Sequence, residues 1–479
     1  MSDIKKNFIY SSILTSANYV FPLITYPYVS RILGVTNIGI CNFIDSIINY
    51  YIMFSLMGIV AVAIREIAAN KNDKEKLSRT FSGLFVLNSI STAIVLTLLL
   101  ISIYTVPKLY EYKELMFIGF FKVLFNYLLI DWFYKGIENF KYITKYGLIT
   151  KSLYVACIFI FVTDKSDYYE YYLLSMLMIA ANAMINVLHS RKLVRFSFNG
   201  ISLRPYLTPF FVLGIYIFLT SMYTTFNVAY LGFVCGETEV GYYTTATKLH
   251  GIFLALFTAF TGVMMPRMSS LVAERNFDEF RLLLLKSLHV LFVFAIPVVV
   301  FSTVFAPQII QIISGAGYEP AAIPMRIVMP LILIIGYEQI LILQVLMPLK
   351  KDKTIFINSC IGAAIGVLAN ILLVPKLNSI GSALVWVLSE FVVLILAQRC
   401  LSKFLNVKFP FKELSFHIAL SLPCALSVAF IASFFENAIT GLLLGFGFIL
   451  TYYYVLYVHI MQDPFILSFI KSIRSKFSI

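Results

Sequence analysis

Apolar residues recur along the chain in long blocks that are separated by short polar segments. About fourteen of these blocks have roughly 18–25 residues, the length that a helix needs to cross a hydrocarbon core about 30 Å thick. The pattern therefore predicts an all-α polytopic membrane protein. The predicted spans are 8–30, 41–63, 80–105, 115–134, 146–163, 170–189, 207–233, 241–265, 282–306, 327–348, 354–374, 381–398, 414–434 and 441–461.

Lysine and arginine are distributed unevenly between alternate loops. With the N-terminus placed in the cytoplasm, the cytoplasmic segments hold 27 of the 37 basic residues and the opposite loops hold 6. Because cytoplasmic loops carry the excess of positive charge, both termini are predicted to be cytoplasmic. The net charge of +13 is then mostly a topology signal, and nucleic acid is not an expected partner. Span 8–30 is interpreted as a retained helix and not as a cleaved signal peptide.

The second half of the chain repeats features of the first half. Equivalent residues lie 202 positions apart in the pairs Gly39 and Gly241, Arg65 and Arg267, and Arg79 and Arg281. The even number of six spans between the copies gives both the same orientation, which predicts a twofold axis along the membrane normal. We expect an N-terminal lobe over 1–205, a C-terminal lobe over 206–400, and two further spans with a cytoplasmic tail over 401–479.

Composition excludes several classes of protein. The chain is 60% hydrophobic and 13% charged, with a mean hydropathy of +0.88, which a soluble domain of this length could not accommodate. The six cysteines are scattered, so neither a disulfide framework nor a metal site is predicted. No catalytic motif and no histidine pair is present, which favours a transporter over an enzyme and predicts no cofactor.

Three spans carry polar stripes, and the one on span 8–30 consists of Ser12, Thr15, Tyr19, Pro22 and Tyr26. Asn42, Asp45 and Asn49 share one face of span 41–63, since their spacing is i, i+3 and i+7. The stripe on span 207–233 consists of Thr220, Tyr223, Thr224, Asn227 and Tyr230. Amides, hydroxyls and aromatic rings suit sugars, but such residues also join helices in membranes. Both interpretations stay open at this point.

Basic residues within or at the ends of spans are candidates for binding phosphate. They are Arg31, Lys248, Lys122 and Arg326. A cavity lined by these cations would attract phosphate-bearing cargo. Snorkelling to the membrane interface is an alternative for Arg31 and Arg326, because both lie at span ends.

Acidic residues at membrane depth are expensive to insert and therefore need an explanation. Asp45, Glu338 and Asp131 are candidates for coupling or gating, and Glu390 is a further one. Through the offset of 202, Asp45 corresponds to the neighbour of Lys248. An acid and a base at similar depth would form a gate pair, a switch sensitive to H⁺ or Na⁺, or a structural ion pair.

The run Pro22-Leu-Ile-Thr-Tyr-Pro-Tyr-Val-Ser-Arg31-Ile-Leu-Gly34, followed by Ile38-Gly39 and the polar stripe of span 41–63, resembles the start of Wzx-type O-antigen flippases. These belong to the multidrug/oligosaccharidyl-lipid/polysaccharide exporter superfamily. The resemblance implies alternating access between two lobes in the bacterial inner membrane. It implies an undecaprenyl-pyrophosphate-linked oligosaccharide as cargo, moved from the cytoplasmic to the periplasmic leaflet. Membrane lipids and the polysaccharide polymerase machinery are the implied partners.

Two other functions are consistent with parts of the sequence. A cation-coupled multidrug exporter of the same superfamily would usually have twelve spans and an acidic cavity, whereas this chain has more spans and mostly basic candidates. A membrane-embedded polymerase or acyltransferase would need a clustered acid/base site or a large external loop. Turnover of a flippase would be driven either by an H⁺ or Na⁺ gradient or by the cargo gradient alone.

Overall fold

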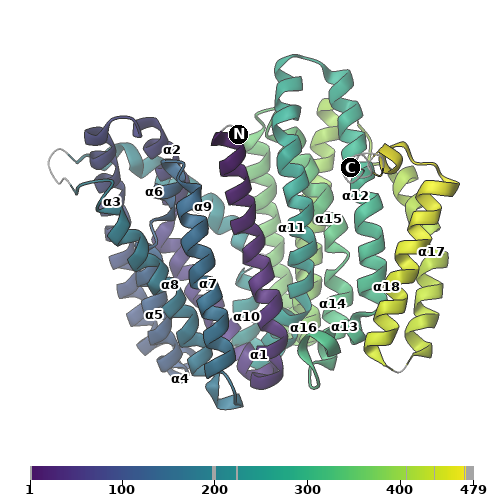
Figure 1. Cartoon of the computed structure of the whole chain (residues 1–479), viewed down its shortest axis with the longest axis horizontal. Coiled ribbons are helices and arrows are strands. Elements are labelled where there is room, and N and C mark those ends of the chain that lie inside the picture. Colours follow the sequence, from purple (N-terminus) through teal and green to yellow (C-terminus); the bar gives the residue numbers. More distant parts are fainter. Residues whose placement is uncertain are drawn as a thin grey trace, which may run out of the picture. The chain divides into compact units, whose positions relative to one another are not determined.

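The structure is a computed structural model that describes residues 3–196, 201–222, 225–405, 407–435, 437–468 and 470. Within these residues all regular secondary structure is helical, and there is no β-strand (Figure 1). The predicted all-α fold is therefore confirmed. The predicted cytoplasmic tail after residue 470, together with Tyr223 and Thr224 of the polar stripe on span 207–233, lies outside the described residues.

The helices of the first half are α1 (Asp3–Leu56), α2 (Ile59–Asn70), α3 (Lys74–Thr105), α4 (Pro107–Glu111), α5 (Lys113–Leu128), α6 (Asp131–Gly136), α7 (Phe140–Phe161), η1 (Lys165–Asp167), α8 (Tyr168–Ser190), α9 (Arg204–Ser221) and α10 (Thr225–Cys235). Those of the second half are α11 (Glu237–Ala273), α12 (Phe277–Val304), α13 (Ala306–Ser314), η2 (Glu319–Ala321), α14 (Ala322–Val328), α15 (Leu331–Gln339), η3 (Ile340–Leu346), α16 (Asp352–Leu405), α17 (Phe411–Phe434), α18 (Ala438–Tyr454) and η4 (Val455–Ile460).

Ten helical stretches of the described residues are long and apolar enough to cross a membrane, or up to eleven if the bent pair within α11 counts as one span. The two 54-residue helices, α1 and α16, each contain a break. Helix α1 is interrupted at Gly34, with φ 74 and ψ 170, and α16 at Asn378, with φ 52. A 54-residue helix would be about 80 Å long, so each break separates two membrane-length legs. The chain is a multi-pass membrane protein, and the number fourteen stays a prediction.

Helix α1 ends earlier than the pattern of apolar residues predicts. Span 41–63 was expected to continue to residue 63, but the helix stops at Leu56 and α2 begins at Ile59. At the break, Met57 has a positive φ of 39, and the backbone N–H of Gly58 donates to the carbonyl of Phe210 on α9 at 3.1 Å. A side chain at Gly58 would meet that carbonyl at 2.6 Å. The close approach of α9 accounts for the break.

The chain forms two compact units. The first unit comprises residues 1–245, 314–317 and 359–389, and the second comprises 246–313, 318–358 and 390–479. In the first unit α1 packs on α3, α5 and α7, and α5 packs on α8. In the second unit α12 packs on α15 and α17, and α17 packs on α18. The predicted boundaries at 205 and 400 stay predictions.

Candidate functional site

Equivalent positions of the sequence repeat touch each other within the first unit. The hydroxyls of Thr36 and Thr238 are 2.9 Å apart, and the Asn42 amide donates to the Thr244 hydroxyl at 3.0 Å. Both pairs are separated by 202 residues, which is the offset of the repeat. A residue faces its own equivalent only near a twofold axis. These contacts place the second leg of α1 against the start of α11. They agree with the twofold axis expected from the repeat, which stays a prediction.

Two glycines allow the backbones to approach at this place. A Cβ atom on Gly39 would lie 1.8 Å from the carbonyl oxygen of Glu237, and one on Gly241 would lie 2.3 Å from that of Val35. The two contacts are reciprocal, because Glu237 is 202 residues after Val35. We call the set of Thr36, Gly39, Asn42, Thr238, Gly241 and Thr244 the glycine crossing. Any side chain at Gly39 or Gly241 would push the two helices apart.

The polar stripe on the second leg of α1 continues from the crossing to an ion pair. The Asp45 carboxylate accepts hydrogen bonds from the Lys122 ammonium of α5 and, at 3.0 Å, from the Tyr172 hydroxyl of α8. The ammonium also lies 4.3 Å from the centroid of the Tyr172 ring. The side chain of Lys122 is only 6% exposed, whereas that of Asp45 is 41% exposed. The Asp45 carboxylate is therefore partly accessible, and it neutralises the buried Lys122 ammonium.

Three other candidates of the first unit have different surroundings. Arg31 is exposed at the end of the first leg of α1, and its stem lies against Gly315, where an added Cβ would be 3.0 Å from its Cγ. Asn49 is exposed on the second leg. Asn227 is fully buried and donates to the Tyr243 hydroxyl at 3.1 Å and the Ser382 carbonyl at 2.7 Å. Asn227 thus joins α10 to α11 and α16.

Asp131 begins α6 and accepts a hydrogen bond at 3.0 Å from the amide of Asn186 on α8. Two candidate cations belong to the second unit. Lys248 on α11 is exposed, and Arg326 on α14 is exposed and donates from Nε to the Thr303 carbonyl at 3.1 Å.

The candidate acid Glu338 on α15 is buried beside a second buried acid. Its carboxyl group lies close to that of Glu390 on α16. Glu338 therefore stays a candidate for the predicted coupling to an H⁺ or Na⁺ gradient, and this role stays a prediction.

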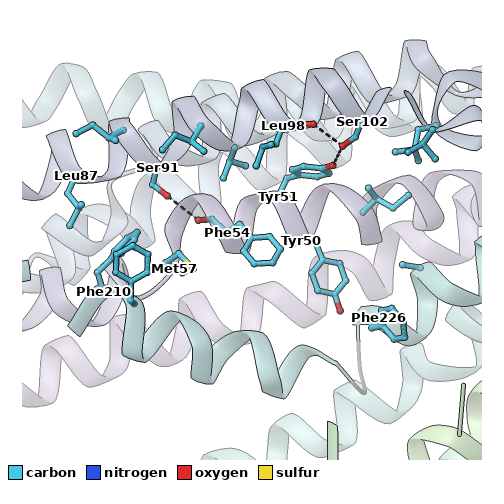
Figure 2. A pocket seen from close by; sticks show the side chains of 18 of the residues that line it. Tyr50, Tyr51, Phe54, Met57, Leu87, Ser91, Leu98, Ser102, Phe210 and Phe226 are labelled. Atoms are coloured by element: carbon cyan, nitrogen blue, oxygen red, sulfur yellow. Dashed lines mark hydrogen bonds between the residues drawn. The ribbon is translucent and has the colours of Figure 1, made fainter. Parts of the chain in front are cut away.

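A groove of about 870 Å³ lies in the first unit between the second leg of α1 and helices α3, α9 and α10. Figure 2 shows its side chains, which are almost all apolar or aromatic. Most polar groups on its wall form hydrogen bonds within the protein: Tyr51 donates to the Ser102 hydroxyl at 2.6 Å, and Ser91 donates to the Phe54 carbonyl at 3.1 Å (Figure 2). Leu87 and Ser102 line it along α3, a distance of about 22 Å. This α3 groove suits a long hydrocarbon chain.

The model of a family described as "Polysaccharide biosynthesis protein" matches residues 4–272. The chain belongs to this family. It is 27% identical over 401 residues to the "Putative O-antigen transporter" of Escherichia coli (strain K12), covering 81% of this chain and 94% of that protein. A protein of the same name from Shigella dysenteriae is 25% identical over 274 residues, which cover 56% of this chain and 68% of that protein. The predicted resemblance to Wzx-type transporters is confirmed, and the chain is a transporter and not an enzyme.

Solved structures of two transporters share the fold. The lipid II flippase MurJ in its inward closed conformation aligns with a TM-score of 0.76 and 17% identity, over 95% of this chain and 100% of that one. An outward-facing multidrug-resistance transporter of the MATE family aligns with a TM-score of 0.56 and 15% identity, over 82% and 93%. At these identities the similarity concerns the fold alone.

Several residues of the site were not predicted. The sequence placed Asn42 and Asp45 on one face and identified Lys122 as a cation at membrane depth, but it did not predict that Lys122 and Tyr172 are the partners of Asp45. No local pattern links residues so far apart in the chain. Thr238 and Thr244, in contrast, could have been found, because adding the offset of 202 to Thr36 and Asn42 leads directly to them.

Proposed function

We propose that this transporter is a flippase for a lipid-linked oligosaccharide. Its cargo is an undecaprenyl-pyrophosphate-linked repeat unit of an O-antigen or capsule, which moves from the cytoplasmic to the periplasmic leaflet of the bacterial inner membrane by alternating access. Membership in the polysaccharide biosynthesis family carries the proposal. The names of the relatives, O-antigen transporter and lipid II flippase, support a saccharide attached to a lipid.

The α3 groove supports the lipid part of the cargo. Isoprenoid chains are long and purely hydrocarbon, and the groove offers an apolar wall over most of the depth of a hydrocarbon core. Four of its hydroxyl groups, those of Tyr50, Tyr51, Ser91 and Ser102, already form hydrogen bonds within the protein, so a polar headgroup would gain few hydrogen bonds there. We assign the polyprenyl tail to this groove. Arg31 of the first unit and Lys248 of the second are each a candidate contact of the pyrophosphate.

The function is tested by depleting the protein and locating the lipid-linked glycan. Accumulation of the glycan in the cytoplasmic leaflet is the expected result. Normal export would refute the proposal. A fall in drug efflux with unchanged glycan export would favour a multidrug exporter instead.

Arg31→Ala and Lys248→Ala, each used to complement the depleted strain, should lower flipping by about tenfold or more, because a charge-assisted hydrogen bond to phosphate contributes about 1.5–3 kcal/mol. Flipping and protein abundance are measured together. Lys376→Ala removes another exposed cation, which is predicted to lie on the same side as Arg31, and should have no effect. If abundance falls along with flipping, the two cations have a structural role.

Filling the α3 groove should impair transport without unfolding the protein. Ile94→Trp adds a large ring to a groove-lining position and should lower flipping several-fold, because the tail must then remain in bulk lipid. Leu426→Trp on α17 is the matched control, since it places the same ring on a lipid-exposed helix surface outside the groove. Equal effects of the two variants would contradict the assignment.

A further inference from the structure

A second cavity, of about 650 Å³, opens in the second unit where α12 and α17 begin. Three basic side chains line it: Arg281 from α12, Lys408 from the loop after α16, and Lys412 from the first turn of α17. All three belong to segments that the charge distribution assigns to the cytoplasmic side. We call this cavity the basic pocket.

Acidic side chains do not neutralise the three cations of the basic pocket. Within the described residues, none of them forms an ion pair or a hydrogen bond, and Glu413 is the single acid that lines the pocket. Elsewhere in this unit Arg267 pairs with Glu279 at 2.5 Å. Three like charges around one cavity repel each other, so an anion that binds there is stabilised by all three.

Hydrogen bonds and an aromatic contact hold the loop that carries Lys408 in place. The Val407 carbonyl accepts hydrogen bonds from Gln398 at 3.1 Å and Ser402 at 3.0 Å. The Tyr337 hydroxyl binds Gln398 at 2.5 Å, and the Phe409 ring packs edge-on against Tyr337 at 5.3 Å. Because these contacts fix the loop, the basic pocket is formed before any ligand arrives, and binding costs little conformational entropy.

Exposed apolar side chains adjoin the charges. Phe411 is 69% exposed and Leu285 is 43% exposed, and both line the pocket. A soluble anion would gain nothing from these two side chains. An amphiphile with an anionic phosphate and a hydrocarbon tail would contact both the cations and the apolar rim, as expected at the interface between membrane and cytoplasm.

We infer that the basic pocket binds the phosphodiester headgroup of an anionic membrane phospholipid from the cytoplasmic leaflet. Arg281, Lys408 and Lys412 hold the phosphate, and the acyl chains lie over Phe411 and Leu285. This lipid is a resident ligand and not the transported cargo. The site is independent of the α3 groove and of the proposed function.

The test uses the full chain, purified in a mild detergent and offered equal amounts of phosphatidylglycerol and phosphatidylethanolamine. Native mass spectrometry counts the retained lipids, and the wild type should retain phosphatidylglycerol selectively. The triple variant Arg281→Gln, Lys408→Gln and Lys412→Gln should bind it about 100-fold more weakly, since each cation near an anionic headgroup contributes about fivefold.

A second triple variant is matched in residue types and in loss of charge: Lys353→Gln, Arg399→Gln and Lys403→Gln remove exposed cations of the same unit outside the pocket. It should retain phosphatidylglycerol, and so should Lys408→Arg with Lys412→Arg, which keeps the charges. Equal losses in both triple variants would overturn the site. Displacement of the lipid by millimolar inorganic phosphate, or retention of polyprenyl pyrophosphate in preference to phosphatidylglycerol, would overturn the choice of ligand.

Discussion

Asp45→Leu is expected to destabilise the protein by about 3 kcal/mol, at the lower end of the range for breaking a buried ion pair. The substitution leaves the Lys122 ammonium unpaired in a site where its side chain is only 6% exposed. The lower end applies because Asp45 itself is partly exposed and was partly solvated before the change. Thermal unfolding in detergent measures the effect.

The double variant Asp45→Leu with Lys122→Met should recover most of this stability, because removing both charges leaves nothing buried and unpaired. The exposed pair Arg267 and Glu279 provides the control: Glu279→Leu should change the stability by at most about 1 kcal/mol. If the double variant is no more stable than Asp45→Leu, the ion pair does not determine the stability of this region.

The same variants separate structure from function. If Asp45 serves only to neutralise Lys122, the stable double variant should flip cargo normally. If the acid gates or couples transport, flipping should stay low although the fold is restored. We expect the second outcome, because the Asp45 side chain is 41% exposed and a cargo or an ion can reach its carboxylate.

The helical membrane fold could largely be predicted from local sequence patterns. Only some of the helix breaks could be predicted in this way. Length alone requires a break between spans 8–30 and 41–63, and Gly34 is the residue that permits it because its φ of 74 suits glycine. The break at Met57 has a different origin. Apolar residues continue past it, and the interruption depends on the contact between Gly58 and Phe210, more than 150 residues later.

Some features of the candidate site could likewise be predicted from the sequence, and others could not. The shared face of Asn42 and Asp45 follows from helical spacing, and the offset of 202 follows from comparing the two halves of the chain. Neither reveals which helices touch. The pairing of Asp45 with Lys122 depends on the packing of α1 against α5, and the proximity of Glu338 to Glu390 joins residues more than 50 positions apart in the chain. Such contacts are determined by tertiary packing and leave no periodic signal in the sequence.

Joining the glycine crossing covalently is expected to stop transport. In the variant Thr36→Cys with Thr238→Cys, a disulfide should form readily, because the native hydroxyls are 2.9 Å apart. Alternating access requires the two repeats to separate on one side of the membrane during each cycle. If this separation takes place at the crossing, flipping should fall to background after oxidation and recover after addition of a reductant.

The control is a disulfide that joins two helices of the same repeat. Ser55 on α1 and Thr92 on α3 are buried, and their hydroxyls are 2.7 Å apart, so Ser55→Cys with Thr92→Cys creates a comparable cross-link. These helices should move together, and flipping should persist in the oxidised protein. Gel mobility after alkylation verifies that both disulfides form. Undiminished flipping with the crossing locked would mean that the repeats separate elsewhere, and that Gly39 and Gly241 form a fixed pivot around which the helices tilt.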